Sequence, residues 1–228
     1  IHFISRSPSV FHAFHGVKEA LLYSGFTEIR EEDPWHIEKG GKYVVTRNGS
    51  ALIAFAVPES GADSFRITAS HADSPCFKIK ENPEIKEGPY VKLNVEGYGG
   101  MIMSTWLDRP LSVAGRLIVR ENGHLAQKLA AVDGTMVVIP SVAIHMDRNV
   151  NHKKDWNVQK DLLPLYGLAT EKTSFMDVIA ASANVKTEDI VAHDLYLYSR
   201  VPGTIWGEEK EFISSPKLDD LQCAFATF

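Results

Sequence analysis

Residues 70–75 of the sequence, Ser-His-Ala-Asp-Ser-Pro, place a histidine two positions before an aspartate. In an extended segment, residues i and i+2 point to the same side of the chain, so His71 and Asp73 would share one face. One ring nitrogen of His71 could then bind a metal ion while the other donates a hydrogen bond to Asp73, which fixes the tautomer and makes the imidazole a better ligand. Taken alone, these residues more often form a capped strand end whose histidine is only hydrogen-bonded.

Two adjacent carboxylates, Asp219 and Asp220, follow Pro216 at the point where a helix is expected to begin. A carboxylate at a helix start is often only an N-cap, which accepts hydrogen bonds from backbone N–H groups. In a two-metal hydrolytic site, by contrast, such a carboxylate bridges ions that lie ~3.5 to 4 Å apart. The pair by itself does not decide between these roles.

A second histidine pair, His12 and His15, would share one helix surface and could hold a metal ion together. Without a third ligand, two solvated or partly packed histidines are the more common outcome.

The elements that must position these residues differ along the chain, and the first 75 residues combine a helix with short strands. Ser7-Pro8-Ser9 is a helix start signal and Gly25 an end signal, with apolar residues at helical spacing between them. The turn pair Asn48-Gly49 predicts a hairpin of residues 43–47 and 51–57. A strand at residues 65–69 is expected to lead into the His71 motif, which would place that motif where open α/β sheets bind their ligands.

Between residues 76 and 206 the pattern changes to several strands at short spacing, which predicts a mostly β module. One helix is expected inside it, because Ser174 and Asp177 have the spacing of a capping box ahead of an apolar run. The expected strands are residues 90–96, 111–119, 125–132, 136–139 and 194–198.

The composition is that of an ordinary globular protein, with 228 residues, 44% hydrophobic and 23% charged. A net charge of -5 with interspersed signs makes nucleic acid and anionic membranes poor candidate partners. Cys76 and Cys223 form neither a disulfide framework nor a thiolate zinc site, so a reducing, cytoplasmic location is expected. No apolar run reaches the ~20 residues that a spanning helix needs.

The sequence begins at Ile1 without an initiator methionine and ends inside an expected helix, residues 219–228. No helix stop signal follows the apolar stripe of that helix. We therefore expect the chain to be a fragment of a longer protein.

Seven stretches, in order along almost the whole chain, resemble the N-terminal half of the aspartyl aminopeptidase family of dinuclear zinc metallopeptidases, which includes the vacuolar aminopeptidase I type. One such stretch means little, but seven in register favour a metal site over a capped strand end. The stretches are residues 3–8, 25–26, 70–75, 106–109 with Leu111, 139–146, Pro164 and residues 215–221.

The resemblance implies a role for individual residues. His71 matches a metal ligand, Asp73 the carboxylate that orients it, and Asp219 the carboxylate that bridges two zinc ions. Asp220 is the weaker candidate ligand, because family members have Asn or Asp there. His145 matches a histidine that reaches into a neighbouring subunit's active site and contacts the substrate; from the residues alone it would be only a strand-end histidine in the β module.

The resemblance also implies an α/β fold, in which a catalytic zinc-peptidase α/β sandwich domain is interrupted by a β-rich dimerisation domain. Residues 1–75 would be the first part of the catalytic domain, 76–206 the dimerisation domain, and 207–228 the resumption of the catalytic domain. The Trp106-Leu107-Asp108-Arg109 stretch is expected to contribute packing, with a buried ion pair beside an aromatic ring, rather than chemistry.

The implied function is that of a zinc-dependent aminopeptidase that hydrolyses N-terminal residues from peptides and assembles as a homo-oligomer built from dimers. Acidic N-terminal residues, Asp or Glu, are the usual preference in much of the family. The family's paired glutamates, a further Asp and a final His ligand are missing from the sequence, so the chain as it stands is expected to be inactive.

Two alternatives stay open. A non-catalytic homologue that retains an oligomerisation or binding module ranks second, because a decayed site would have no need of His71, Asp73, Asp219 and His145 together. A dinuclear aminopeptidase with a different residue preference is the third.

Overall fold

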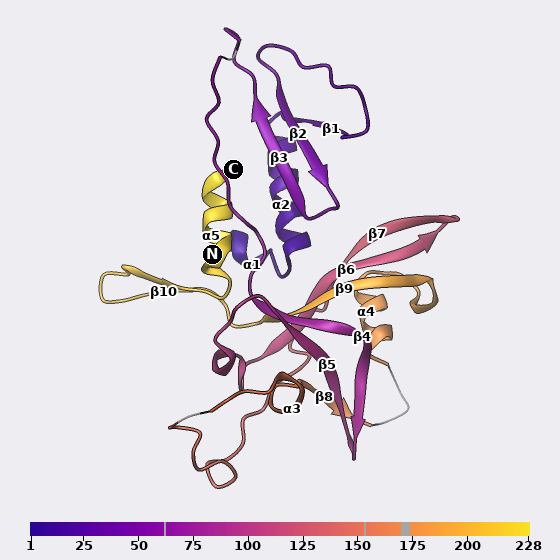
Figure 1. Cartoon of the computed structure of the whole chain (residues 1–228), viewed down its shortest axis with the longest axis vertical. Coiled ribbons are helices and arrows are strands. Elements are labelled where there is room, and N and C mark those ends of the chain that lie inside the picture. Colours follow the sequence, from indigo (N-terminus) through magenta and orange to yellow (C-terminus); the bar gives the residue numbers. More distant parts are fainter. Residues whose placement is uncertain (62, 153, 170–173) are drawn as a thin grey trace. The chain divides into compact units, whose positions relative to one another are not determined.

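A computed structural model describes residues 1–61, 63–152, 154–169 and 174–228. The chain divides into two compact units. Unit 1 combines residues 1–74 with 203–228, and unit 2 is residues 75–202. The units therefore change at residues 74/75 and 202/203, next to the changes expected at 75/76 and 206/207. Unit 2 is inserted in the sequence of unit 1 (Figure 1).

Unit 2 is built on a six-stranded antiparallel sheet with the order β7-β6-β9-β4-β5-β8. Its elements are β4 (Cys76–Glu87), β5 (Tyr90–Tyr98), η1 (Met103–Trp106), β6 (Leu111–Glu121), β7 (His124–Ala131), α3 (Val158–Asp161), β8 (Leu165–Leu168), α4 (Phe175–Ser182), η2 (Thr187–Asp189) and β9 (Ile190–Ser199).

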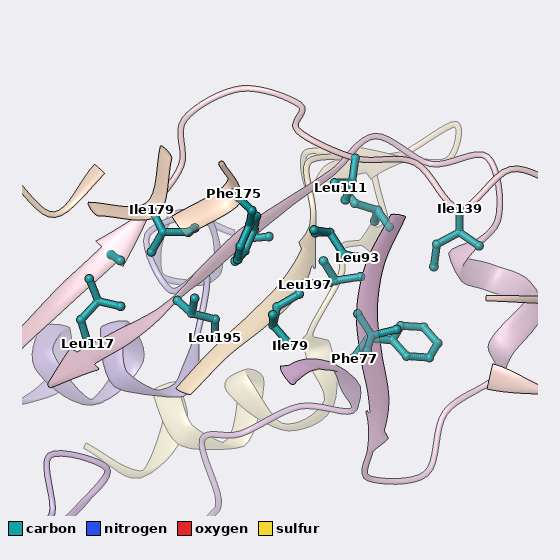
Figure 2. Packing of buried hydrophobic residues seen from close by; sticks show 14 of the residues in the cluster. Phe77, Ile79, Leu93, Leu111, Leu117, Ile139, Phe175, Ile179, Leu195 and Leu197 are labelled. Atoms are coloured by element: carbon teal, nitrogen blue, oxygen red, sulfur yellow. The ribbon is translucent and has the colours of Figure 1, made fainter. Parts of the chain in front are cut away.

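The core of unit 2 is one cluster that combines alternate side chains of these strands with side chains of helix α4. Figure 2 shows this packing, with Phe77, Leu117 and Leu195 from the strands and Phe175 and Ile179 from α4. All five side chains are inaccessible to solvent. Complete burial of large apolar side chains is the main source of folding free energy, so unit 2 has a consolidated core of its own.

Local sequence signals account for much of unit 2. The capping box is present, because the Ser174 hydroxyl accepts a hydrogen bond from the Asp177 N–H and the Asp177 carboxylate accepts one from the Ser174 N–H. Strand 136–139 was wrong as a strand: Val137, Val138 and Ile139 make only isolated bridges to other segments. Strand β4 was not expected, because its charged residues and Pro83 hide the alternation, and its pairing shifts register next to that proline.

Unit 1 is a mixed α/β unit. Its elements are α1 (His2–Ser5), α2 (Val10–Tyr23), β1 (Thr27–Ile29), β2 (Lys42–Arg47), β3 (Ala51–Ala56), β10 (Thr204–Trp206), β11 (Phe212–Ser214) and α5 (Leu218–Thr227). The order of its three-stranded sheet is β1-β2-β3, with β1 parallel and β3 antiparallel to β2.

Helix α2 packs on this sheet through Val17 and Leu21, which meet Val44 of β2. The hairpin of β2 and β3 closes at Asn48 and Gly49, whose φ angles of 53° and 64° are those of the two central residues of a type I′ turn. Both the helix and the hairpin were expected from the sequence.

The strand predicted at residues 65–69 is wrong. The segment has no assigned secondary structure and pairs with no strand of the described residues. Phe65 and Ile67 are 89% and 84% exposed. Apolar alternation identifies a chain suited to a sheet, but a strand exists only when a second chain segment supplies its hydrogen bonds.

No helix of the described residues is long and apolar enough to cross a membrane.

Candidate metal centre

Three side chains of unit 1, His71, Asp219 and Asp220, converge at one point. Each offers one potential ligand atom, and these atoms lie within 4.8 Å of one another. The residues come from both sides of the inserted unit: His71 from the extended segment before it, and the two aspartates from the start of α5 after it. The structure thus assembles in space what the sequence separates.

The imidazole of His71 has a defined orientation. Its Nδ1 lies 3.1 Å from the Asp73 Oδ1 and 3.1 Å from the Asp73 carbonyl oxygen. A carbonyl oxygen can only accept, so Nδ1 carries the proton and donates it. In the neutral ring, Nε2 is then left with a lone pair. This is the tautomer expected for a metal ligand whose second nitrogen is held by a carboxylate.

The lone pair of Nε2 faces the aspartates. Nε2 lies 3.7 Å from the Asp219 Oδ1 and 3.5 Å from the Asp220 Oδ2. The longer distance exceeds that of a hydrogen bond. Two ligands bound to one zinc ion at about 2.1 Å with tetrahedral geometry stand about 3.4 Å apart. The donor set of one imidazole nitrogen with carboxylate oxygens therefore fits zinc in chemistry, and the distances from Nε2 to the two carboxylates are close to that separation.

Two hydrogen bonds attach the His71 segment to α5. The Ser70 and Thr227 hydroxyl oxygens are 2.9 Å apart, and the His71 N–H donates to the Asp220 Oδ2 at 3.3 Å. Beneath them Ala72 packs against a small apolar cluster that includes Ile4, Ala13 and Leu221. These contacts fix the position of His71 along α5.

The start of α5 is irregular and presents the two carboxylates differently. Lys217 has a φ of 60°, Asp219 and Asp220 have non-helical backbone angles, and the peptide bond between them is cis. The Asp219 side chain is 83% exposed, whereas that of Asp220 is 16% exposed. Lys217 Nζ donates to the Ser7 carbonyl oxygen at 2.5 Å, which attaches this turn to the segment after α1.

The electrostatics favour an ionised Asp220 beside a basic His71 imidazole. Burial by itself lowers the pKa of His71, but the hydrogen bond to Asp73 and the charge of Asp220 outweigh it, so the pKa is raised overall. A hydrogen bond from the Cys223 thiol and the contact with His71 lower the pKa of Asp220. Asp220 therefore remains ionised at neutral pH and can accept hydrogen bonds or bind a cation.

The sequence ranked Asp220 below Asp219 as a ligand. In the structure, a carboxylate oxygen of each aspartate lies within 4.8 Å of a ring nitrogen of His71. The adjacency of the two aspartates was the only available signal. Which of them binds metal stays a prediction.

His145 belongs to unit 2, where it lies in an exposed turn instead of at a strand end. Among the described residues, no third candidate ligand joins the histidine pair at residues 12 and 15. The Nδ1 of His12 lies 2.8 Å from the Ser9 hydroxyl, and burial first, then the charges of Lys217 and His15, lower its pKa to about 4.

The chain matches a family model described as aminopeptidase I zinc metalloprotease (M18), over residues 3–228. A probable M18 family aminopeptidase 2 from Clostridium acetobutylicum is 46% identical over 235 residues, which are 99% of this chain and 54% of that protein. Aspartyl aminopeptidase 4 from Saccharomyces cerevisiae is 35% identical over 260 residues, which cover 100% of this chain and 53% of that protein.

Solved structures resemble the fold over almost its full length. A chain of the cryo-EM structure of the Ape4 and Nbr1 complex superimposes with a TM-score of 0.93 at 32% identity, covering 98% of this chain and 47% of that one. The structure of an S. cerevisiae mApe1 dodecamer gives a TM-score of 0.81 at 25% identity, with 99% and 52% covered. These similarities confirm the α/β fold class and the family resemblance. The chain spans about half the length of the curated relatives it matches.

Proposed function

The chain belongs to the aminopeptidase I zinc metalloprotease (M18) family, and from this premise we propose that the protein containing it is a zinc-dependent aminopeptidase that removes N-terminal residues, acidic ones preferentially, from peptides. The observation that carries the proposal is the convergence of His71, Asp219 and Asp220 around one point, with Asp73 behind the histidine.

In this proposal His71 and Asp219 bind zinc, and Asp73 holds the His71 ring with its Nε2 directed at the site. Asp220 supports the arrangement by accepting the His71 backbone N–H. Bound zinc supplies Lewis-acid polarisation of a carbonyl group and activation of water. Two ligands cannot satisfy a pair of zinc ions, so the remaining ligands and the general base belong to the part of the family's length that this chain does not span.

His145 has a different part in the proposal. It contacts the substrate carbonyl in the active site of a neighbouring subunit, with unit 2 as the dimerisation domain. The dodecameric state of the S. cerevisiae mApe1 structure supports a homo-oligomer. A cytoplasmic location is part of the same proposal, supported by the two-cysteine composition.

Zinc titration of the full-length protein, which supplies the remaining ligands, tests the metal site directly. Asp219→Ala should abolish measurable binding, because it removes a ligand. Asp73→Ala should weaken binding about 10- to 100-fold, because the ring loses its orienting partner. Glu19→Ala, an exposed carboxylate of α2, is the matched control and should bind like the unmodified chain. Binding should also weaken as the pH falls through the raised pKa of His71, because protons and zinc compete for the ring.

Turnover is tested on the full-length protein, with release of N-terminal Asp or Glu from short peptides as the assay. His145→Ala should lower kcat about 100- to 1,000-fold, the range found for an oxyanion contact, and leave the zinc content unchanged. Zinc loss from that variant would count against the role of His145. A full-length protein that binds zinc without releasing any N-terminal residue would favour the non-catalytic alternative.

A further inference from the structure

Asp108 has an unusual backbone conformation and forms two hydrogen bonds with a segment about 30 residues farther along the chain. Its φ of 56° lies in the left-handed region, which Asp and Asn tolerate better than most residues. Its Oδ1 accepts the Ser141 N–H at 2.8 Å, and its own N–H donates to the Ile139 carbonyl oxygen at 2.9 Å. The expected ion pair with Arg109 is wrong: both side chains are exposed, and the Arg109 Nε donates to the Thr105 carbonyl oxygen at 2.7 Å.

The residues on both sides of this contact are fixed to the core of unit 2. Trp106 meets the buried ring of Phe77 edge-on, with centroids 5.2 Å apart. Leu107 forms a parallel bridge with Ile139, whose side chain is fully buried. Asp108 and Ser141 therefore contact each other directly beside the point where Leu107 and Ile139 are held to the core.

The segment that leaves the core there carries His145. Past Ser141, the side chains of Val142, Ile144 and Met146 are exposed, and the Met146 N–H donates to the Ala143 carbonyl oxygen at 2.8 Å, which forms a turn around His145. Farther along, Asp147 pairs with Lys154 at 2.8 Å. Because these three side chains are exposed, they make few contacts that could orient the loop. The direction of the loop therefore depends on the hydrogen bond that holds its first residue, Ser141.

We propose that Asp108 is a positioning residue that acts through His145: its carboxylate fixes the start of the loop at Ser141, so that His145 is presented to the neighbouring subunit in one orientation. The inference rests on the proposed function of His145. The hydrogen bonds from the Ser141 hydroxyl and N–H, which lower the pKa of Asp108, also keep that acceptor ionised at neutral pH.

Two substitutions separate the hydrogen bond from the backbone requirement. Asp108→Asn and Asp108→Gly both tolerate a positive φ, but only Asn keeps an oxygen that can accept the Ser141 N–H. In the full-length protein Asp108→Gly should lower kcat about 10- to 100-fold, the cost of misplacing a reacting group by about 1 Å, whereas Asp108→Asn should stay within about 3-fold of the unmodified enzyme. Asp133→Gly, which removes a different exposed carboxylate that accepts a backbone N–H, is the control and should leave kcat unchanged.

Oligomers of mixed subunits then distinguish positioning of His145 from a structural role. Differently tagged subunits are co-expressed and purified through both tags. Asp108→Gly mixed with Asp219→Ala should recover activity, because the intact loop of the Asp219→Ala subunit serves the intact metal site of its neighbour. Asp108→Gly mixed with His145→Ala should not recover, because neither subunit supplies a functional loop.

The reverse pattern, recovery with His145→Ala and none with Asp219→Ala, would overturn the inference, because Asp108 would then serve its own subunit's site. Full activity of Asp108→Gly would overturn it as well. If His145→Ala alone is fully active, the proposed role of His145 fails; if His145→Ala is impaired and Asp108→Gly is not, only the role of Asp108 fails. Hydrogen exchange of the Ser141 amide provides a readout independent of activity and should accelerate in Asp108→Gly but not in Asp108→Asn.

Discussion

The two units differ in how much of their apolar surface is buried. Among the described residues, unit 2 has a core cluster of 16 buried side chains, whereas the two clusters wholly within unit 1 hold three buried side chains each. Unit 1 also leaves Phe65 and Ile67 almost completely exposed. The three converging candidate ligands all lie in the less consolidated unit. The larger core and the candidate metal centre are thus located in different parts of the chain, and each can be altered separately.

Removing a central side chain of unit 2 should produce the largest effect. Phe77→Ala should destabilise unit 2 by about 3–5 kcal/mol, because it leaves a cavity in a fully buried position. Urea unfolding followed by hydrogen exchange of the β6 and β9 amides measures this change. Leu125→Ala, at an exposed position of β7, is the control and should cost under about 0.5 kcal/mol. A small effect of Phe77→Ala would contradict the description of unit 2 as consolidated.

Lowering the pH should destabilise unit 1 through His12, by an amount between the effects of the other two predictions. The folded pKa of about 4 lies below the ordinary 6.5, because burial, followed by the charges of Lys217 and His15, disfavours the charged ring. The unfolded chain therefore binds the proton first, and stability falls as the pH drops from 6.5 to 4, by up to about 3 kcal/mol. Unfolding of α2 by urea at pH 7 and pH 4.5 measures the loss, which His12→Gln should reduce. The pKa of His71 is raised, so His71 stabilises the folded state as the pH falls. This contribution is the same in the unmodified chain and in His12→Gln, so it cancels when their losses of stability are compared.

The smallest effect is expected where unit 1 exposes its apolar residues. Ile67→Ala should change the stability of this chain by less than about 0.5 kcal/mol, since the side chain loses almost no buried area. Ile79→Ala, the same substitution at a buried position of unit 2, should cost about 2–5 kcal/mol. Equal losses at the two positions would show that residues 65–69 are packed in solution.

Features of the fold that depend on neighbouring residues could be predicted from the sequence. Two examples are the turn at Asn48 and Gly49 and the capping box of Ser174 and Asp177. Each depends on contacts within three residues, so the local sequence is enough to predict it. The strand at residues 65–69 could not be decided, because its existence depends on a partner that local alternation does not reveal.

The same distinction applies to the candidate sites. The contact of His71 with Asp73 spans two positions and was anticipated, whereas that of His71 with Asp220 spans 149. The contact of Asp108 with Ser141 was not predicted, because the two residues lie 33 positions apart. The sequence also gives no signal of the positive φ angle of Asp108. Metal ligation and the function of His145 were inferred from family resemblance and stay predictions.

The insertion of unit 2 between His71 and Asp220 has a consequence for the order in which the chain folds. In an unfolded chain, bringing these residues together closes a loop of about 149 residues, and the entropy cost rises by about 0.6 kcal/mol with each doubling of loop length. Once residues 75–202 have folded, most of that loop is replaced by a body whose ends are a fixed distance apart, and only residues 72–74 and 203–219 remain flexible. The β-rich unit would therefore reduce the entropic cost of bringing the three candidate ligands together if it folds first, even though it contributes none of them.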